Sequence, residues 1–364
     1  TDTVNPRTRP GPDANAFAAD LLERGAAGYA GFAASLMLQR DQALADRAGA
    51  TGLGSWRAHL TQRVLELAAA VAAGDARLFT GRVTWSRKAF QARGQRDGDI
   101  RVSLEALRDV LIDKLPEAAT AEAVAYLDAA LSLLAGPVPA MDPSELDPAR
   151  PVDRVALRYL QQILEGDAAA AVRTVAAAAG ELGHRTVYLD VLMPAQREVG
   201  RLWHAGDLTI AEEHMVTSTT QRAMAVLAAA GQPAEPNGRT VVLAAVAGNV
   251  HDIGLRALGD LFQLAGWRVI FVGSDVPALE LPTLLTFFEV DLLVLGATLG
   301  THVPRVEQAI RSIRERCERE VRVIVGGSAF DEAPELWQRV GADGYGARLD
   351  AAVALGGRLV GLAA

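Results

Sequence analysis

A single cysteine, Cys317, occurs among the 364 residues, so no disulfide can form within the chain. This scarcity suits a reducing compartment, and we expect a cytoplasmic protein. No apolar run approaches the length of about 20 residues that spans a bilayer, which argues against a membrane partner. Residues 1–14 are polar and proline-rich and lack the apolar core of a signal peptide. They predict a loose tail.

An excess of positive charge is also missing. The formal net charge is −8, and residues 1–150 contain 17 lysines and arginines against 19 aspartates and glutamates. A protein that binds nucleic acid directly presents a basic face, so we expect no direct binding of nucleic acid. Half of the residues are hydrophobic, which is enough to form a substantial buried core.

Two stretches that contain proline divide the chain. Gly136 to Pro151 carries five prolines without hydrophobic periodicity, and residues 232–239 carry two prolines and Asn237-Gly238. Such compositions are typical of linkers. The predicted organisation is a tail at 1–14, a helical sensory domain at 15–135, a linker at 136–152, a four-helix bundle at 153–231, a linker at 232–239 and an α/β domain at 240–364.

Both helical regions carry alanine and leucine at helical spacing. In the first region, Gly74-Asp75 and Leu115-Pro116 mark breaks between helices. In the second, Pro194 should kink the third helix, and the run from Thr209 to Glu212 has the pattern of a capping box at the start of the fourth. The helices of this bundle are predicted at 153–164, 167–182, 186–203 and 209–229.

The last third of the chain alternates continuous apolar runs with amphipathic runs, which predicts a parallel sheet covered on both faces. Five βα units indicate a flavodoxin-like, Rossmann-type domain whose ligand crevice lies where the first and third strands diverge. Strands are predicted at 240–247, 267–272, 292–297, 321–325 and 342–345, and helices at 253–264, 279–288, 303–318, 333–340 and 349–362.

The turn after the first of these strands contains a histidine, His251, followed by Gly254. A lone histidine here would equally indicate a structural turn. Its x-His-x-x-Gly spacing resembles the Asp-x-His-x-x-Gly motif of cobalamin-binding domains, in which the histidine replaces dimethylbenzimidazole as the lower cobalt ligand. The resemblance implies that His251 is that ligand. Asn249 stands at the acidic position of the motif, and we expect its amide oxygen to accept a hydrogen bond from the imidazole.

Glycines and a hydroxyl at the ends of the later strands support the same resemblance. Gly254, Gly326 and Gly327 stand where the family lines the slot for the nucleotide tail of the cofactor. The serine that usually follows the third strand is missing, which leaves Thr298 as the hydroxyl that could bond the tail. Further predicted cofactor contacts are Asp252, Ile253, Ser274 and Leu299, and Asp275 also borders the crevice.

In the helical bundle, Trp203 is followed after nine residues by Glu213-His214. This spacing resembles the adenosylcobalamin-binding photoreceptors of the CarH type. It implies that Trp203 packs on the adenosyl group, that Glu213 accepts hydrogen bonds from it, and that His204 becomes the upper cobalt ligand after light removes it. The alternative is a core tryptophan, a solvated Glu-His pair and an ordinary histidine at a helix end.

The resemblance implies a light sensor rather than an enzyme: photolysis would let the bundle repack and change homo-oligomerisation or docking to a protein partner. Corrinoid methyl carriers use an Asp/Ser/His relay to move a proton, and Asn249 and Gly296 replace two of its groups. No barrel domain of the kind a mutase needs is evident. Two alternatives remain: a corrinoid methyl carrier of a methyltransferase system, and a cobalamin-sensing adaptor or anti-repressor.

The stretch from Arg77 to Arg101 is locally basic and contains Phe79, Trp85 and Phe90. It can be a solvated helix face or a pocket for a planar, anionic ligand. A helical domain before a light-sensing cobalamin domain resembles the photocobilins, which implies biliverdin as a second chromophore. With Cys317 in another domain, the bilin would be held non-covalently. The candidate contacts are His59, Arg57, Trp85 and Arg82.

Overall fold

The computed structural model describes residues 12–331 and 333–362, and these fall into two compact units that divide between Pro139 and Ala140. Most of the predicted tail, residues 1–11, lies outside the described residues. The tail prediction was too long at its end, because helix α1 (Pro12–Arg40) begins before Ala14. Proline is favoured in the first turn of a helix, where its missing N–H would have no partner anyway.

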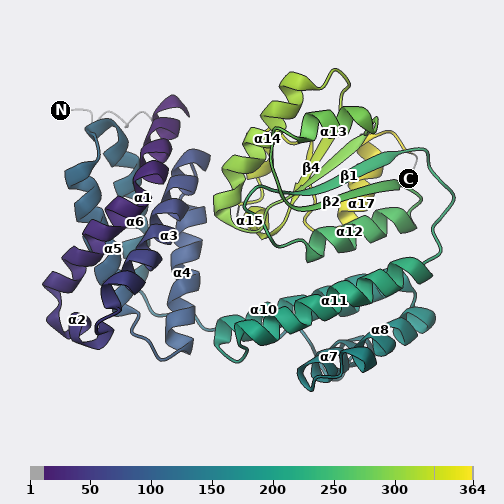
Figure 1. Cartoon of the computed structure of the whole chain (residues 1–364), viewed down its shortest axis with the longest axis horizontal. Coiled ribbons are helices and arrows are strands. Elements are labelled where there is room, and N and C mark those ends of the chain that lie inside the picture. Colours follow the sequence, from purple (N-terminus) through teal and green to yellow (C-terminus); the bar gives the residue numbers. More distant parts are fainter. Residues whose placement is uncertain (1–11, 332, 363–364) are drawn as a thin grey trace, which may run out of the picture. The chain divides into compact units, whose positions relative to one another are not determined.

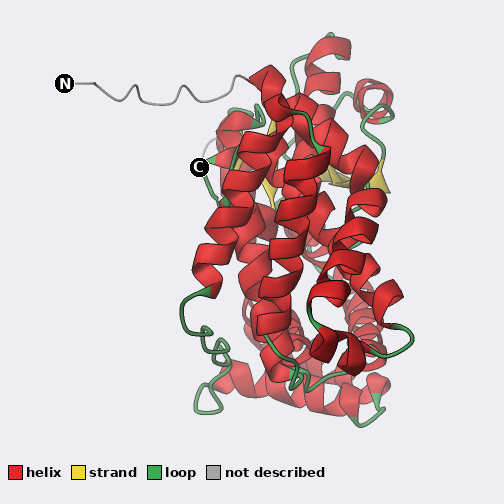
Figure 2. Cartoon of the chain, turned by 90° about the vertical axis from the view of Figure 1, so that its left-hand side faces the viewer, coloured by secondary structure: helices red, strands yellow, loops and turns green. Residues whose placement is uncertain are grey.

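The first unit is helical, as its spacing of apolar residues predicts (Figure 2). α1 packs along α3 (Gly52–Ala73) and α5 (Gly98–Lys114). The predicted break at Gly74 is confirmed, because that glycine ends α3 in the left-handed conformation with φ 61°. Pro116 precedes α6, as predicted. The remaining helices are α2 (Gln42–Ala48), α4 (Arg77–Ala92) and α6 (Glu117–Leu134).

The second unit begins with the predicted helical bundle. The capping box is confirmed: the Thr209 hydroxyl accepts from the Glu212 N–H at 3.2 Å, and the Thr209 N–H donates to the Glu212 carboxylate at 2.8 Å. A π-helical segment precedes Pro194, where the proline ring would otherwise crowd the carbonyl of Asp190. The bundle elements are α7 (Pro151–Leu164), α8 (Ala168–Leu182), α9 (His184–Thr186), η1 (Val187–Leu192), α10 (Met193–Ala205) and α11 (Ile210–Ala230).

A parallel sheet of five strands, in the order β2-β1-β3-β4-β5, follows within the described residues and confirms the predicted flavodoxin-like fold. Helices cover both of its faces, with α12 and α17 on one and α13 and α14 on the other (Figure 1). The strands are β1 (Thr240–Val246), β2 (Arg268–Val276), β3 (Leu292–Gly296), β4 (Arg322–Gly326) and β5 (Gly344–Tyr345). The helices are α12 (Ile253–Leu264), α13 (Leu281–Phe287), η2 (Gly300–His302), α14 (Val303–Arg316), α15 (Ser328–Asp331), α16 (Leu336–Arg339) and α17 (Leu349–Leu359).

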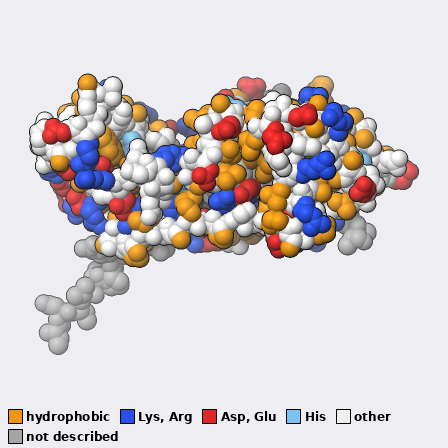
Figure 3. Space-filling view, turned by 90° about the horizontal axis from the view of Figure 1, so that it is seen from below, with side chains coloured by type: hydrophobic (Ala, Val, Ile, Leu, Met, Phe, Trp, Pro, Cys, Tyr) orange, Lys and Arg blue, Asp and Glu red, His pale blue; other side chains and the backbone are white. Residues whose placement is uncertain are grey.

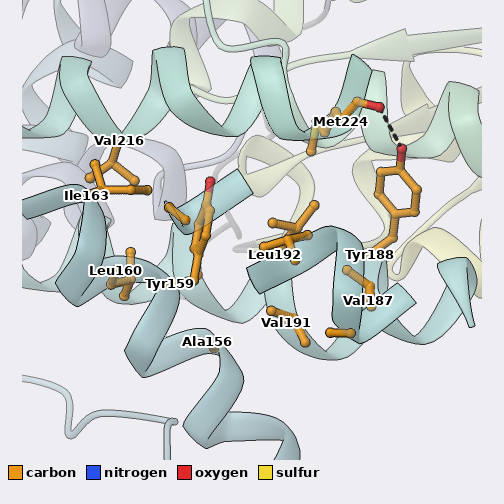
Figure 4. Close-up of a cluster of buried hydrophobic side chains, with 14 of the residues drawn as sticks. Ala156, Tyr159, Leu160, Ile163, Val187, Tyr188, Val191, Leu192, Val216 and Met224 are labelled. Carbon is orange, nitrogen blue, oxygen red and sulfur yellow. Dashed lines mark hydrogen bonds between the residues drawn. The ribbon is translucent and has the colours of Figure 1, made fainter. Parts of the chain in front are cut away.

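The bundle and the sheet domain share one hydrophobic core, part of which Figure 4 shows. Ala257 and Leu261 of α12 belong to the same buried cluster as the bundle residues. The buried Tyr188 hydroxyl lies 2.6 Å from the Asp260 carboxylate on α12 and 3.3 Å from the Met224 carbonyl. Burial raises the pKa of both Tyr188 and Asp260. These contacts therefore connect the bundle to α12, the helix that follows the turn containing His251.

Replacing Tyr188 with Phe should lower the free energy of unfolding by about 1–3 kcal/mol, because the partly buried Asp260 carboxylate loses its hydrogen-bond donor. Urea denaturation of the apoprotein measures this. Tyr345→Phe is the matched control, because it removes a Tyr–Asp hydrogen bond to Asp331 at an exposed site and should cost less than about 1 kcal/mol. Equal losses in the two variants would contradict the role of the Tyr188–Asp260 contact.

Charged side chains of both signs are intermingled on the face seen in Figure 3. Among the helices of the described residues, none is both long and apolar enough to cross a membrane.

Candidate functional site

Hydrogen bonds of the backbone connect the turn between β1 and α12 to the end of β2. The Gly248 N–H donates to the Asp275 carboxylate at 2.7 Å, and the Asp275 N–H donates to the Asn249 carbonyl at 3.1 Å. Gly248 has φ 83°, and Asp275 has φ 57°, which is uncommon for a residue other than glycine. The end of β2 thus holds the turn after β1 in one conformation.

Asn249 is fully buried and does not play the part that the motif suggested. Its side-chain oxygen accepts from the backbone N–H of His251 at 3.1 Å, and its amide nitrogen donates to the Gly296 carbonyl at 3.0 Å. We expected that oxygen to face the imidazole of His251. An asparagine side chain readily bonds the backbone two residues on, and here that local bond replaces the one to the ring.

His251 itself is exposed at the carboxyl edge of the sheet. Its imidazole makes no hydrogen bond with any residue that the structure describes. A neutral imidazole nitrogen is a common ligand of transition metals. His251 is therefore available as a metal ligand, and the hydrogen bonds of the turn hold its backbone in place.

A second histidine, His302, lies near His251, and it was not among the residues predicted for the site. It is 6% exposed, and its Nδ1 accepts from the N–H groups of Thr298 and Leu299 at 3.3 and 3.1 Å. Burial, and then the proximity of His251, lowers its pKa. The available signal was a histidine in the loop after the third strand, directly before a predicted helix.

The glycines of the predicted tail slot differ in their surroundings. Gly327 has φ 103°, and a Cβ there would lie 2.3 Å from the Ala297 carbonyl oxygen. A Cβ on Gly326 would lie 3.2 Å from the Gly346 carbonyl oxygen, whereas one on Gly254 would meet no atom within 4 Å. The loops after β3 and β4 therefore approach too closely for any side chain at position 327.

The other predicted contacts of this lower half surround the same edge. The Thr298 carbonyl accepts from the Ser328 hydroxyl at 2.8 Å, and Thr298 is half-buried. Asp252 pairs with Arg256 at 3.3 Å. Ser274 is exposed, Leu299 is half-buried, and Ile253 packs against the hydrophobic core of the bundle.

The predicted upper residues flank the short connection between α10 and α11. Trp203 and His204 belong to the last turn of α10, and Glu213 and His214 to the start of α11. Trp203 is partly buried and packs against the same bundle core as Ile253, so that core joins the two halves of the site. The Glu213 carboxylate lies 2.6 Å from Nδ1 of the exposed His214 and accepts from the Thr217 hydroxyl at 2.7 Å. His204 is 7% exposed. In this conformation it is a buried histidine.

The first unit brings most of the predicted bilin contacts together. The His59 ring lies 5.4 Å from the Trp56 ring and 5.6 Å from the Phe90 ring. Burial, and then Arg63, lowers the pKa of His59 to about 4. Arg82 stacks 4.4 Å over Trp85. Arg57 is exposed, and because it lies two positions before His59 it belongs to another side of α3.

Two charged residues that the sequence analysis did not single out lie at the centre of this cluster. Arg63 and Glu66 are 3% and 4% exposed and form an ion pair at 2.6 Å, and Arg82 lies 3.5 Å from Glu66. Nε and Nη1 of Arg63 and Nε2 of His59 are buried without a hydrogen-bond partner among the described residues. Such groups usually have partners in folded proteins.

The second unit is similar to known protein families. Residues 155–228 and residues 239–354 each match a B12 binding domain family. The first match covers the bundle from α7 to α11, and the second covers nearly all of the α/β domain.

Known proteins with similar sequences include corrinoid proteins and a transcriptional repressor. The chain is 28% identical to a corrinoid protein of Desulfitobacterium hafniense, over 45% of this chain and 77% of that protein. It is 30% identical to dimethylamine corrinoid protein 1 of Methanosarcina acetivorans, over 51% of this chain and 87% of that protein. It is also 30% identical to the HTH-type transcriptional repressor CarH of Myxococcus xanthus, over 42% of this chain and 50% of that protein.

Proposed function

Since this chain belongs to the family of B12-binding corrinoid proteins, we propose that it is a light sensor that holds adenosylcobalamin with His251 as the lower cobalt ligand. The bundle forms the upper wall of the site, and the carboxyl edge of the sheet forms the lower wall. The sensor would act through a change of conformation rather than through turnover.

The residues present fit this cofactor. His251 offers an exposed imidazole without a hydrogen-bond partner among the described residues, and its backbone is fixed. Gly254 leaves open space at the start of α12, where the nucleotide tail would enter. Thr298 and Ser274 offer hydroxyl groups near the carboxyl ends of β3 and β2, and Gly327 allows the loops after β3 and β4 to pack closely.

Adenosylcobalamin supplies a cobalt–carbon bond that visible light breaks. Trp203 would pack against the adenosyl group from above, and Glu213 would accept hydrogen bonds from it. Loss of this group would leave space beside the ends of α10 and α11, and these ends would then repack, because protein interiors tolerate few voids. His204 would then leave its buried position and approach the metal, which makes the bundle a two-state element.

The observation that favours a sensor over a methyl carrier is the hydrogen bonding of Asn249. Its amide is neutral and is committed to the His251 backbone and to Gly296. Proton relay through the lower ligand needs an acid or base that contacts the imidazole. Within the described residues, no carboxylate makes a hydrogen bond with the His251 ring.

The absorbance spectrum of the holoprotein tests the proposal. In the dark, the protein reconstituted with adenosylcobalamin should show an alkylcobalamin spectrum, and green light should convert it irreversibly to a different one. Size-exclusion chromatography before and after illumination should show a change in oligomeric state. A spectrum that green light leaves unchanged would contradict light sensing while leaving cobalamin binding intact.

A corrinoid methyl carrier is the second candidate, and the similarity to corrinoid proteins of Desulfitobacterium and Methanosarcina supports it at least as well. Cofactor identity separates the two functions. A methyl carrier would hold methylcobalamin and exchange its methyl group with a partner enzyme. A third candidate, a cobalamin-sensing adaptor, would bind hydroxocobalamin in the dark as tightly as the adenosyl form.

We further propose that the first unit binds biliverdin non-covalently. The cluster around Arg63 supports this, because its unpaired cationic nitrogens could bind propionate groups and its aromatic rings could pack on the bilin plane. Nε2 of His59, which has no hydrogen-bond partner among the described residues, could form a hydrogen bond with a pyrrole nitrogen of the bilin.

Reconstitution with biliverdin should add a red absorption band to the wild-type protein. Arg63→Met should remove most of that band, while Arg57→Met should leave it unchanged because Arg57 is exposed away from the cluster. If biliverdin gives no red band, the first unit is better explained as a dimerisation or partner-docking module.

A further inference from the structure

A buried arginine holds the start of the linker that joins the two units. Arg87 of α4 is 6% exposed, and its guanidinium donates to the carbonyls of Gly136 and Pro137 at 2.8 and 3.1 Å. It also donates to the carbonyl of Leu133, in the last turn of α6, at 3.3 Å and pairs with Asp97 at 2.9 Å. Hydrogen bonds from a charged donor are stronger than those between neutral groups. The linker is therefore anchored to the first unit up to Pro137.

The other end of the linker is anchored to α10, the helix that carries two of the predicted upper residues of the site. The Ser144 hydroxyl donates to the Glu198 carboxylate at 2.9 Å, and Glu145 pairs with Arg197 at 2.8 Å. Leu146 is 7% exposed and belongs to the hydrophobic cluster of the bundle, which also contains residues of α10. Three consecutive linker residues thus depend on the position of one helix.

Glu198 connects this second anchor to the end of α10. It is 9% exposed and pairs with Arg201 at 2.7 Å. The hydrogen bond from Arg201 lowers the pKa of Glu198, so the carboxylate is ionised at neutral pH. Trp203 follows Glu198 by about one and a half helical turns. A shift of the Trp203 end of the helix would therefore also displace the acceptor of the Ser144 hydroxyl.

The span between the two anchors is short. Residues 138–143, Val-Pro-Ala-Met-Asp-Pro, contain two prolines and no glycine, and each proline favours extended backbone at the residue before it. If residues 144–146 came away from α10, the next anchored residue would be Asp147, whose N–H donates to the buried Asp153 carboxylate at 2.9 Å. The span would then grow by three residues, or about 10 Å when extended.

We propose that residues 144–146 form a latch on α10 that opens after illumination and lengthens the span between the two anchors. This proposal rests on the light response proposed above, in which His204 leaves its buried position at the end of α10. That movement would shift Glu198 away from Ser144, whereas Asp147 stays bound to the bundle. Light received at the cobalamin would thus reach the first unit through the length of the linker.

Hydrogen exchange of the full-length holoprotein, measured by mass spectrometry in the dark and after green light, tests the opening of the latch. The amides of residues 144–146 should exchange about tenfold faster after illumination, because Ser144 loses its hydrogen bond to a charged group. Complete photolysis with unchanged exchange at residues 144–146 would overturn the proposal.

Variants of Ser144 test the same contact without cobalamin. In the apoprotein, Ser144→Ala should make the amides in the last turn of α10 exchange about 3–10-fold faster, because Glu198 loses its donor from the linker. Ser144→Thr keeps a hydroxyl and should stay near the wild type. Ser132→Ala is the matched control, because its exposed hydroxyl bonds the Asp128 carbonyl within α6. If α10 were as protected in Ser144→Ala as in this control, the latch would be wrong.

Failure of the light response and failure of the latch give different results. A holoprotein whose spectrum green light leaves unchanged would contradict the proposed light response, and the apoprotein comparison would still decide whether Ser144 holds α10. Photolysis that leaves residues 144–146 protected would overturn only the latch.

Discussion

Replacing His251 with Leu should weaken adenosylcobalamin binding by more than about 100-fold and remove the nitrogen ligand from below the cobalt. A ligand supplies a direct bond to the metal, so its loss should exceed the 10–100-fold effect typical of residues that only support a ligand. The fold should be unaffected, because the His251 ring is exposed and makes no hydrogen bond with the described residues. Titration of the apoprotein with adenosylcobalamin, followed by absorbance, measures both effects.

His184→Leu is a matched control for this change. His184 belongs to α9, outside the edge of the sheet that carries His251. Its replacement should leave the affinity and the spectrum unchanged. If His251→Leu bound the cofactor as tightly as this control, with the same lower coordination, the proposed site would be wrong.

Replacing Gly327 with Ala should lower the free energy of unfolding by about 2–6 kcal/mol. The new Cβ would lie 2.3 Å from the Ala297 carbonyl oxygen, and φ 103° is unfavourable for any side chain. Since domains have only about 5–15 kcal/mol of stability, this change should bring the apoprotein close to unfolding. Urea denaturation measures the loss.

Gly254→Ala separates stability from cofactor binding. A Cβ at Gly254 would meet no atom within 4 Å, and alanine in a helix is more stable than glycine by up to about 1 kcal/mol. The variant should therefore fold at least as well as the wild type. If the nucleotide tail passes this position, the added methyl group should weaken cobalamin binding by about tenfold. Unchanged binding would place the tail elsewhere.

The α/β domain was largely predictable because its strands are continuous apolar runs between amphipathic helices. The predicted helix at 253–264 has the observed bounds, and the predicted strand order is the observed one. His251 was found from its place in the turn after the first strand. These features depend on local pattern, which a sequence displays directly.

Features that depend on burial and on the hydrogen bonding of side chains were missed. His302 was not singled out, because the sequence does not show that its ring is buried and accepts from the backbone N–H groups of Thr298 and Leu299. The ion pair of Arg63 and Glu66 became notable only when burial showed that some of its nitrogens have no hydrogen-bond partner. Asn249 was assigned to the wrong partner, because the motif does not show that its side chain bonds its own backbone.

The most direct test of the account is the electron paramagnetic resonance spectrum of the protein loaded with cobalt(II) cobalamin after labelling of its histidines with nitrogen-15. If His251 is the lower ligand, the superhyperfine triplet of the unlabelled protein becomes a doublet in the labelled protein, and neither pattern from histidine is seen in His251→Leu. A triplet that persists after labelling would mean that the nitrogen comes from the cofactor itself and would contradict coordination by His251.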